Sequence, residues 1–303
     1  KLTKGLGAGM KPEVGRDSAV ESYEEIKATL KGADIIFIAA GLGGGTGTGA
    51  AAIIAKAAKE IGALTVSVVT KPFTWEGKKR AGLANLGLEE LKKVSDSIII
   101  VPNDRLLEII DENVGMKDAF KIIDNILYQA VNGMSEVILN PGNSDINTDF
   151  ADVKTIMQHK GMALMGIGRA KGENAAQRAL EDAIDSPLLD KVSLNGAKGI
   201  LIHFNIHPQV SLFAINDVMG TINDRMDSNA EIIFGTTSDS TLEKDEVKIT
   251  IVATGFESKN DEVEEISEGN EENSNQNNNI VADSENYFDT PPLMRDYIVQ
   301  YQL

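Results

Sequence analysis

A glycine-rich segment, residues 41–49, constrains the fold of this chain more than any other feature. Six of its nine residues are glycines and two are threonines. An apolar run, residues 34–40, precedes it and is typical of a buried strand, and residues 50–61 have the composition of a helix. A strand, a glycine turn and a helix in this order direct free backbone N–H groups and a positive helix end at one point. We therefore predict an anion site, suited to phosphate, where this helix begins.

The rest of the first half alternates between helix and strand patterns, over residues 21–31, 63–69, 77–93 and 97–101. This alternation favours right-handed βαβ units and a mostly parallel sheet. Ligands of such sheets bind at the carboxyl ends of the strands. At that edge we expect the segments that follow the three strands, residues 43–49, 71–80 and 103–104.

A long helix and a second unit follow. Residues 117–139 carry apolar side chains around more than half of the helix circumference, so we expect this helix to be buried between two layers. The second unit has an α+β pattern, with strands over residues 163–168, 199–206, 230–235 and 247–254 and helices over residues 173–186 and 210–226.

Charge and composition exclude several functions. The net charge is −17, and residues 257–286 alone contain ten acidic residues and one lysine. No basic face suited to nucleic acid is evident, and no apolar run approaches the ~20 residues of a membrane span. There is no cysteine, which fits a reducing compartment. We expect a cytoplasmic protein that neither binds nucleic acid directly nor inserts into a membrane.

Three interpretations of the glycine segment can be separated. A P-loop requires Gly-Lys-Ser/Thr, which is absent here. The dinucleotide fingerprint matches loosely through Gly45, Gly47 and Ala50, but the next strand is followed by no carboxylate before Glu76. A tight turn without a ligand needs one or two glycines, not six, so this interpretation is weak.

Residues 43–49 are similar to the signature of the tubulin family, and the whole chain resembles the tubulin/FtsZ family of GTPases, in particular its bacterial cell-division members. Further segments with this resemblance span the chain: residues 5–9, 12–16, 69–73, 76–80, 102–104, 147–152, 186–189, 252–255 and 289–295. Met10 and Lys11 depart from the family pattern, which more often has Ala and Asn there.

The resemblance implies an α/β fold with a Rossmann-like, mostly parallel GTPase domain, a long central helix, a smaller α+β domain and a disordered tail. The expected boundaries are residues 1–116, 117–139 and 140–256, then an acidic linker over 257–286 and a docking peptide over 287–303. We also expect the family's first strands and first glycine loop to lie upstream of Lys1.

The resemblance assigns site residues as well. Phosphates would contact Gly45, Thr46, Gly47, Thr48 and Gly49, with Ala8 and Gly9 beside the γ-phosphate. Glu76 and Arg80 would contact the ribose region and phosphates, while Phe120 and Asn125 would bind guanine. Without the resemblance, Glu76 and Arg80 would form an ordinary exposed helical ion pair, and Phe120 would be a core residue.

The loop with Asn147, Asp149 and Asp152 would enter the nucleotide site of the next subunit, where the carboxylates polarise the attacking water. The plain alternative is that Asp149 and Asp152 only stabilise a helix N-terminus. The implied function is GTP hydrolysis coupled to head-to-tail polymerisation into the bacterial division ring at mid-cell, on the inner face of the plasma membrane. Mg²⁺ is expected with GTP or GDP, although no dedicated metal-ligand cluster is visible in the sequence.

The same resemblance implies that the C-terminal peptide binds membrane-tethering and regulatory division proteins through Asp289, Pro291, Leu293 and Arg295. Two rival functions remain open. A nicotinamide-dependent oxidoreductase would be protected by NAD and not by GTP. A filament protein without turnover would bind nucleotide but would not hydrolyse it. The GTPase interpretation instead expects Asp152→Ala to abolish hydrolysis while GTP binding stays largely intact.

Overall fold

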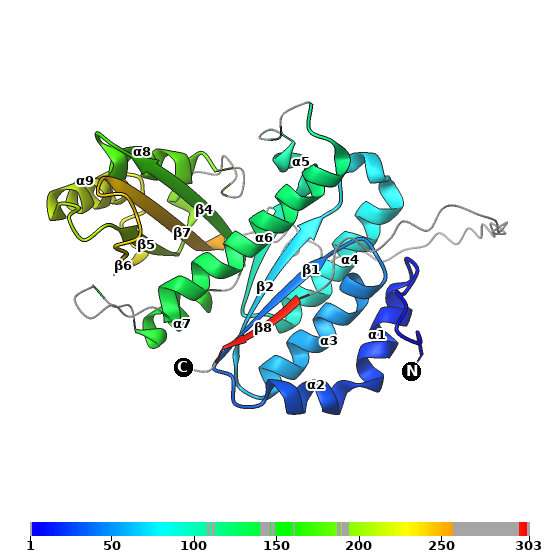
Figure 1. The fold of residues 1–303 in the computed structure, drawn as a ribbon. Helices are drawn as coiled ribbons and strands as arrows, with labels where there is room; N and C mark the ends of the chain where they lie inside the picture. The colour runs from blue at the N-terminus through cyan, green and yellow to red at the C-terminus, as the bar shows by residue number, and fades with distance from the viewer. Residues whose placement is uncertain are drawn as a thin grey trace, which may run out of the picture.

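The computed structural model describes residues 2–107, 110, 113–139, 146, 149–159, 161–186, 189, 194–256 and 297–301. Their strands form one continuous eight-stranded sheet with the order β6-β5-β7-β4-β3-β2-β1-β8 (Figure 1). The sequence predicts two units joined by a long helix. In the structure their strands also meet, because Ile98 on β3 pairs with Met162 on β4.

The first half of the sheet is parallel, as predicted. Its strands are β1 (Ile35–Gly41), β2 (Leu64–Lys71) and β3 (Ser97–Pro102). One face is covered by helices α2 (Tyr23–Leu30), α3 (Thr46–Glu60) and α4 (Lys78–Val94). Ile36 and Ile38 point to that layer, whereas Ile35 and Phe37 point to the opposite layer. Uninterrupted apolar strands are typical of sheets covered on both faces.

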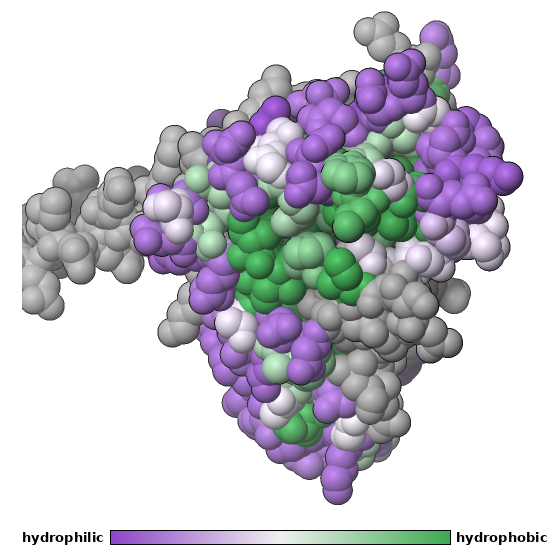
Figure 2. All heavy atoms as spheres, turned by 90° about the vertical axis from the view of Figure 1, so that its left-hand side faces the viewer, coloured by the Kyte–Doolittle hydropathy of each residue, from purple (hydrophilic) through white to green (hydrophobic). Residues whose placement is uncertain are grey.

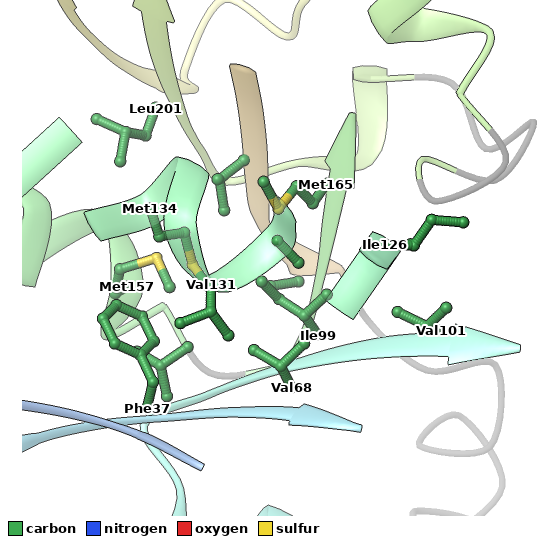
Figure 3. Packing of buried hydrophobic residues seen from close by; sticks show 14 of the residues in the cluster. Phe37, Val68, Ile99, Val101, Ile126, Val131, Met134, Met157, Met165 and Leu201 are labelled. Atoms are coloured by element: carbon green, nitrogen blue, oxygen red, sulfur yellow. The ribbon is translucent and has the colours of Figure 1, made fainter. Parts of the chain in front are cut away.

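Helix α6 (Met116–Leu139) lies across the other face and contacts both halves of the sheet. Figure 3 shows Val131 and Met134 of α6 between Val68 of the first half and Met165 of the second. The apolar side chains of α6 are therefore buried against both halves of the sheet, while Met116 and Tyr128 on its outer side are exposed.

The second half is a mixed sheet. Its elements are α7 (Phe150–Met157), β4 (Met162–Lys171), α8 (Ala175–Ile184), η3 (Leu194–Gly196), β5 (Gly199–Ile206), α9 (Leu212–Asn223), β6 (Glu231–Ser238) and β7 (Glu246–Phe256). Strand β7 is antiparallel to both β4 and β5, while β6 is parallel to β5. Helices α8 and α9 pack on this half in a core of their own.

The sequence patterns did not predict five of the described elements: α1 (Pro12–Glu21), the 3₁₀ turns η1 (Thr74–Glu76) and η3, α5 (Asn103–Leu106) and β8 (Tyr297–Tyr301). Strand β8 comes from the predicted docking peptide and pairs antiparallel with β1, with Tyr297 opposite Ala39. The acidic linker and the predicted docking residues Asp289, Pro291, Leu293 and Arg295 lie outside the described residues. Among the described helices, none combines the length and the apolar character of a membrane span.

Candidate functional site

The glycine segment forms the turn from β1 into α3, as predicted. Gly43 has a φ of +101°, and a Cβ there would lie 3.0 Å from the carbonyl oxygen of Arg80. Gly45 precedes the helix, and a Cβ on it would lie 2.7 Å from the Cβ of Ala8. Residues 8–11 therefore pack against Gly45, and the start of α4 packs against Gly43.

Close packing between α1 and α3 explains two more glycines. A Cβ on Gly49 would overlap the carbonyl oxygen of Pro12, and a Cβ on Gly15 would overlap that of Gly45. The N-termini of α1 and α3 therefore lie next to each other. Each helix N-terminus carries partial positive charge and N–H groups without a partner inside the helix, so the pair favours an anion. Several glycines thus serve helix packing, whereas a Cβ on Gly44 would meet open space.

The two threonines differ in role. Thr48 is buried, and its Oγ1 accepts a hydrogen bond of 2.9 Å from the backbone N–H of Gly43. Thr46 is exposed, and its Oγ1 accepts one of 3.2 Å from the N–H of Ala8. Both oxygens therefore hold the loop together, and each hydroxyl retains its hydrogen for donation. Of the two, only Thr46 presents its side chain to solvent.

Glu76 and Arg80 form a half-buried pair beside the glycine turn. Arg80 donates to Glu76 Oε2 at 2.6 Å, and the N–H of Phe73 donates to Glu76 Oε1 at 2.9 Å. The Glu76 side chain is only 12% exposed. The interpretation as an exposed helical pair is therefore wrong, because Glu76 belongs to η1, before α4, where its carboxylate fixes the turn.

Aromatic side chains continue the site toward α6. Phe73 stacks on Trp75 with ring centroids 5.2 Å apart and meets Phe120 edge to face at 6.1 Å. Phe120 is half-buried and packs against the core, so the interpretation of Phe120 as a core residue holds. Its contact with Phe73 also connects α6 to the segment beside the turn. Asn125 lies further along α6 and is exposed.

Asn103 is a site residue that sequence analysis did not assign. It follows β3 at the same sheet edge and is 4% exposed, yet its Oδ1 has no hydrogen-bond partner among the described residues. Buried polar atoms rarely lack a partner, so this oxygen suits a donor from a ligand. The sequence could have indicated this role, because Asn103 directly follows a predicted parallel strand, where ligands of such sheets bind.

Asp149 and Asp152 lie far from this edge. Asp149 is the N-cap of α7, and its Oδ1 accepts a hydrogen bond of 3.2 Å from the N–H of Ala151. Both carboxylates are exposed, while Asn147 lies outside the described residues. Figure 1 shows α5 at one end of α6 and α7 at the other. A helix of 24 residues is about 36 Å long, so the structure does not bring these carboxylates to the glycine turn.

The described residues contain no group of three or more His, Asp or Glu side chains arranged to hold a metal ion. Near the glycine turn, both carboxylate oxygens of Glu76 are already occupied by Arg80 and the Phe73 N–H. Any cation that enters this site would therefore depend mainly on ligands from the bound anion and water.

The fold and this site define an α/β protein with a glycine-rich turn suited to an anion at the carboxyl edge of a parallel sheet. Residues 1–111 match the GTPase domain of the Tubulin/FtsZ family, and residues 161–257 match the C-terminal domain of the FtsZ family. The chain belongs to the Tubulin/FtsZ family. It carries the GTPase domain of that family, which binds GTP or GDP and hydrolyses GTP.

Solved structures agree with this assignment. An empty FtsZ dimer from M. jannaschii is 47% identical, with a TM-score of 0.78, over 84% of this chain and 73% of that chain. A GTPγS-bound protofilament of CetZ2 from Haloferax volcanii is 19% identical, with a TM-score of 0.68, over 84% of this chain and 76% of that chain. A GDP-bound CetZ1 monomer from the same organism is 19% identical, with a TM-score of 0.71 and the same coverage. The two more distant structures support the fold alone.

Proposed function

We propose that this chain is a self-assembling GTPase whose active site is completed by the next molecule in a head-to-tail filament. The proposal rests on one observation, namely that the length of α6 separates the glycine turn from Asp149 and Asp152. Phe120 lies near the start of this helix, beside the glycine turn, and Asp149 lies beyond its end. If Asp149 and Asp152 act on the bound nucleotide, they must therefore come from another copy.

In the proposed complex, one molecule binds the nucleotide. Backbone N–H groups at the start of α3 bind the phosphates, with Gly45, Gly47, Gly49, Thr46 and Thr48 forming the cradle. Ala8 and Gly9 lie beside the terminal phosphate. Glu76 and Arg80 border the ribose and phosphates, and Phe120 and Asn125 contact the guanine. Mg²⁺ would enter with the nucleotide and help to neutralise phosphate charge.

The neighbouring molecule supplies Asp149 and Asp152, with Asn147 in the same loop. A carboxylate placed beside the terminal phosphate accepts a proton from water as the water oxygen attacks phosphorus. The bond between that phosphorus and the bridging oxygen breaks, and GDP and phosphate are released. Their exposure suits Asp149 and Asp152 to this role, and the Asp149 cap of α7 keeps the loop in place.

Exposed apolar side chains at two separate faces fit a head-to-tail contact. Trp75 and Leu107, beside the nucleotide edge, are 60% and 49% exposed. At the carboxyl ends of β5 and β6, Leu212 and Phe213 are 72% and 80% exposed. Ile146 hydrogen-bonds to Thr236 of β6, so the segment before Asp149 lies at that second face.

Figure 2 shows the side of the molecule that carries α9 and β6. An apolar area occupies its centre and hydrophilic residues surround it, which is the usual arrangement of a protein interface. Two different faces that bind each other generate an open filament. Loss of the terminal phosphate at such a contact would weaken it, so hydrolysis would loosen the filament.

A mixing experiment tests the shared site. Asp152→Ala removes the carboxylate that acts on the neighbour, and Arg80→Ala weakens the nucleotide cradle. Each variant alone should hydrolyse GTP slowly, and Asp152→Ala should still bind GTP. A mixture should regain activity, because an Asp152→Ala molecule holds GTP against the intact carboxylates of an Arg80→Ala neighbour. Additive residual rates in the mixture, or normal hydrolysis by Asp152→Ala alone, would contradict the proposal.

We further propose that the filament forms the division ring on the inner face of the plasma membrane. The C-terminal peptide would bind the membrane-tethering and regulatory proteins through Asp289, Pro291, Leu293 and Arg295. Deletion of residues 287–296, which retains strand β8, should abolish pull-down by an anchor protein but spare assembly and GTP hydrolysis. Retained pull-down would contradict the docking role.

A further inference from the structure

Lys11 lies at the junction of the two helix N-termini. It is the N-cap of α1, and its backbone nitrogen is 2.8 Å from the position of a Cβ on Gly45. Gly9 and Met10 before it have φ values of +56° and +57°. A left-handed conformation costs about 1–2 kcal/mol for a residue such as Met10. The chain accepts this strain in the turn that leads Lys11 into α1.

The site has a direction. The aromatic side chains of Phe73, Trp75 and Phe120 form a cluster on the Gly43 side of the turn, where Pro72 also contacts Gly43. Lys11 lies on the Gly45 side. A nucleotide with its base toward the aromatic cluster and its phosphates over the start of α3 would therefore point its last phosphate toward Lys11.

The charges around the turn leave Lys11 available for an anion. Arg80 is paired with Glu76 at 2.6 Å, and Arg16 lies 3.5 Å from Asp17. Lys11 is exposed, and within the described part of the chain its ammonium forms no ion pair. Glu13 lies in the first turn of α1 and is exposed, and its negative charge complements the partial positive charge of the α1 N-terminus.

We propose that Lys11 binds the terminal phosphate of the bound nucleoside triphosphate and makes the site favour the triphosphate over the diphosphate. This inference rests on the proposed function, because it takes the glycine turn as the nucleotide site. An ammonium is a compact charge with three donors on a flexible stem, which suits a phosphate whose position changes with hydrolysis. When the terminal phosphate leaves, Lys11 loses its contact with the nucleotide. In the proposed filament, this change occurs at the interface between neighbouring molecules, so the preference of Lys11 for the triphosphate is linked to that interface.

The test is a comparison of affinities. Lys11→Gln and Lys11→Asn remove the charge, and Asn is also a favourable helix N-cap. Lys11→Arg keeps the charge. Lys31→Gln is the matched control, since Lys31 is an exposed lysine between α2 and β1, at the opposite edge of the sheet. Binding of GTPγS and of GDP is measured by calorimetry with Mg²⁺, at protein concentrations below assembly, and circular dichroism checks folding.

Lys11→Gln and Lys11→Asn should weaken GTPγS binding about three- to tenfold, as for a solvent-accessible charged contact, and change GDP binding less than about twofold. Lys11→Arg should retain most of the preference, and Lys31→Gln should behave as wild type. Equal losses for both nucleotides, or unchanged GTPγS binding in both neutral variants, would overturn the role of Lys11 alone. A wild-type chain that binds neither nucleotide would instead overturn the proposed function.

Discussion

Phe120 lies near the start of α6, and Asp149 lies beyond its end, so most of the length of the helix separates them. Phe120 meets Phe73 edge to face at 6.1 Å beside the glycine turn, and Asp149 caps α7 beyond the last residue of α6. The helix is about 36 Å long and is held rigidly by its buried face. One chain therefore places the glycine turn near one end of α6 and a pair of exposed carboxylates beyond the other end, and it cannot bring them together by itself.

Gly49→Ala should destabilise the protein. The added Cβ would overlap the carbonyl oxygen of Pro12 and push α1 away from α3. Overpacking of this kind costs about 1–3 kcal/mol, which chemical denaturation would measure. Gly44→Ala is the control, because its Cβ would meet open space. Equal stability of the two variants would contradict the packing role of Gly49.

Phe213→Ser should impair self-assembly without unfolding the chain. The side chain is 80% exposed, so the isolated molecule gains little from it, whereas a buried aromatic contact in a filament contributes strongly. We expect the critical concentration for assembly, measured by sedimentation, to rise at least about fivefold. Leu86→Ser, which changes another exposed apolar residue on α4, should leave it unchanged. An unchanged value for Phe213→Ser would place the contact elsewhere.

Glu246→Gln should lower the melting temperature at neutral pH. Arg169 donates to Glu246 at 2.5 Å, and the N–H of Glu243 donates at 3.1 Å, so these bonds hold the pKa of the Glu246 carboxyl below its ordinary value. The folded state then gains stability from the charged carboxylate above that ordinary pKa and loses it as the pH falls through the lowered pKa.

The difference in melting temperature between Glu246→Gln and wild type should therefore shrink on acidification. Scans from neutral pH to about pH 3 would follow it. Glu243→Gln is the comparison, because Glu243 pairs with Lys171 at an exposed site, where ion pairs contribute little. A difference that stays constant with pH would contradict the charge-dependent role of Glu246.

The pairing of β8 with β1 can be tested by cross-linking, because the chain contains no cysteine. Ala39 lies opposite Tyr297 in the register. Opposite residues of an antiparallel pair have Cα separations within the range of a disulfide. We expect Ala39→Cys with Tyr297→Cys to form an intramolecular disulfide on mild oxidation, detected by a gel shift. Ala39→Cys with Val299→Cys is two residues out of register and should react far more slowly. Equal rates would contradict this register.

Local sequence patterns predicted most of the elements. The apolar run before the glycine segment became β1, because a strand buried on both faces leaves an uninterrupted apolar run. The broad apolar pattern after residue 116 became α6, because its apolar side chains recur with the period of a helix. The turn between β1 and α3 was equally clear, since its glycines are needed locally. Pro12 begins α1, but this helix was missed because its apolar pattern is weak and Gly15 interrupts it.

Tertiary structure decided what no local pattern contains. The sequence by itself determined most of the strands and helices and the position of the glycine turn, because these depend on neighbouring residues. Only the fold decided that two predicted units share one sheet through Ile98 and Met162, and that Lys11 and Arg80 lie on opposite sides of the same turn. It also set Asp149 beyond the far end of α6 from that turn, since the packing of a rigid helix fixes distances between residues that are distant in the sequence.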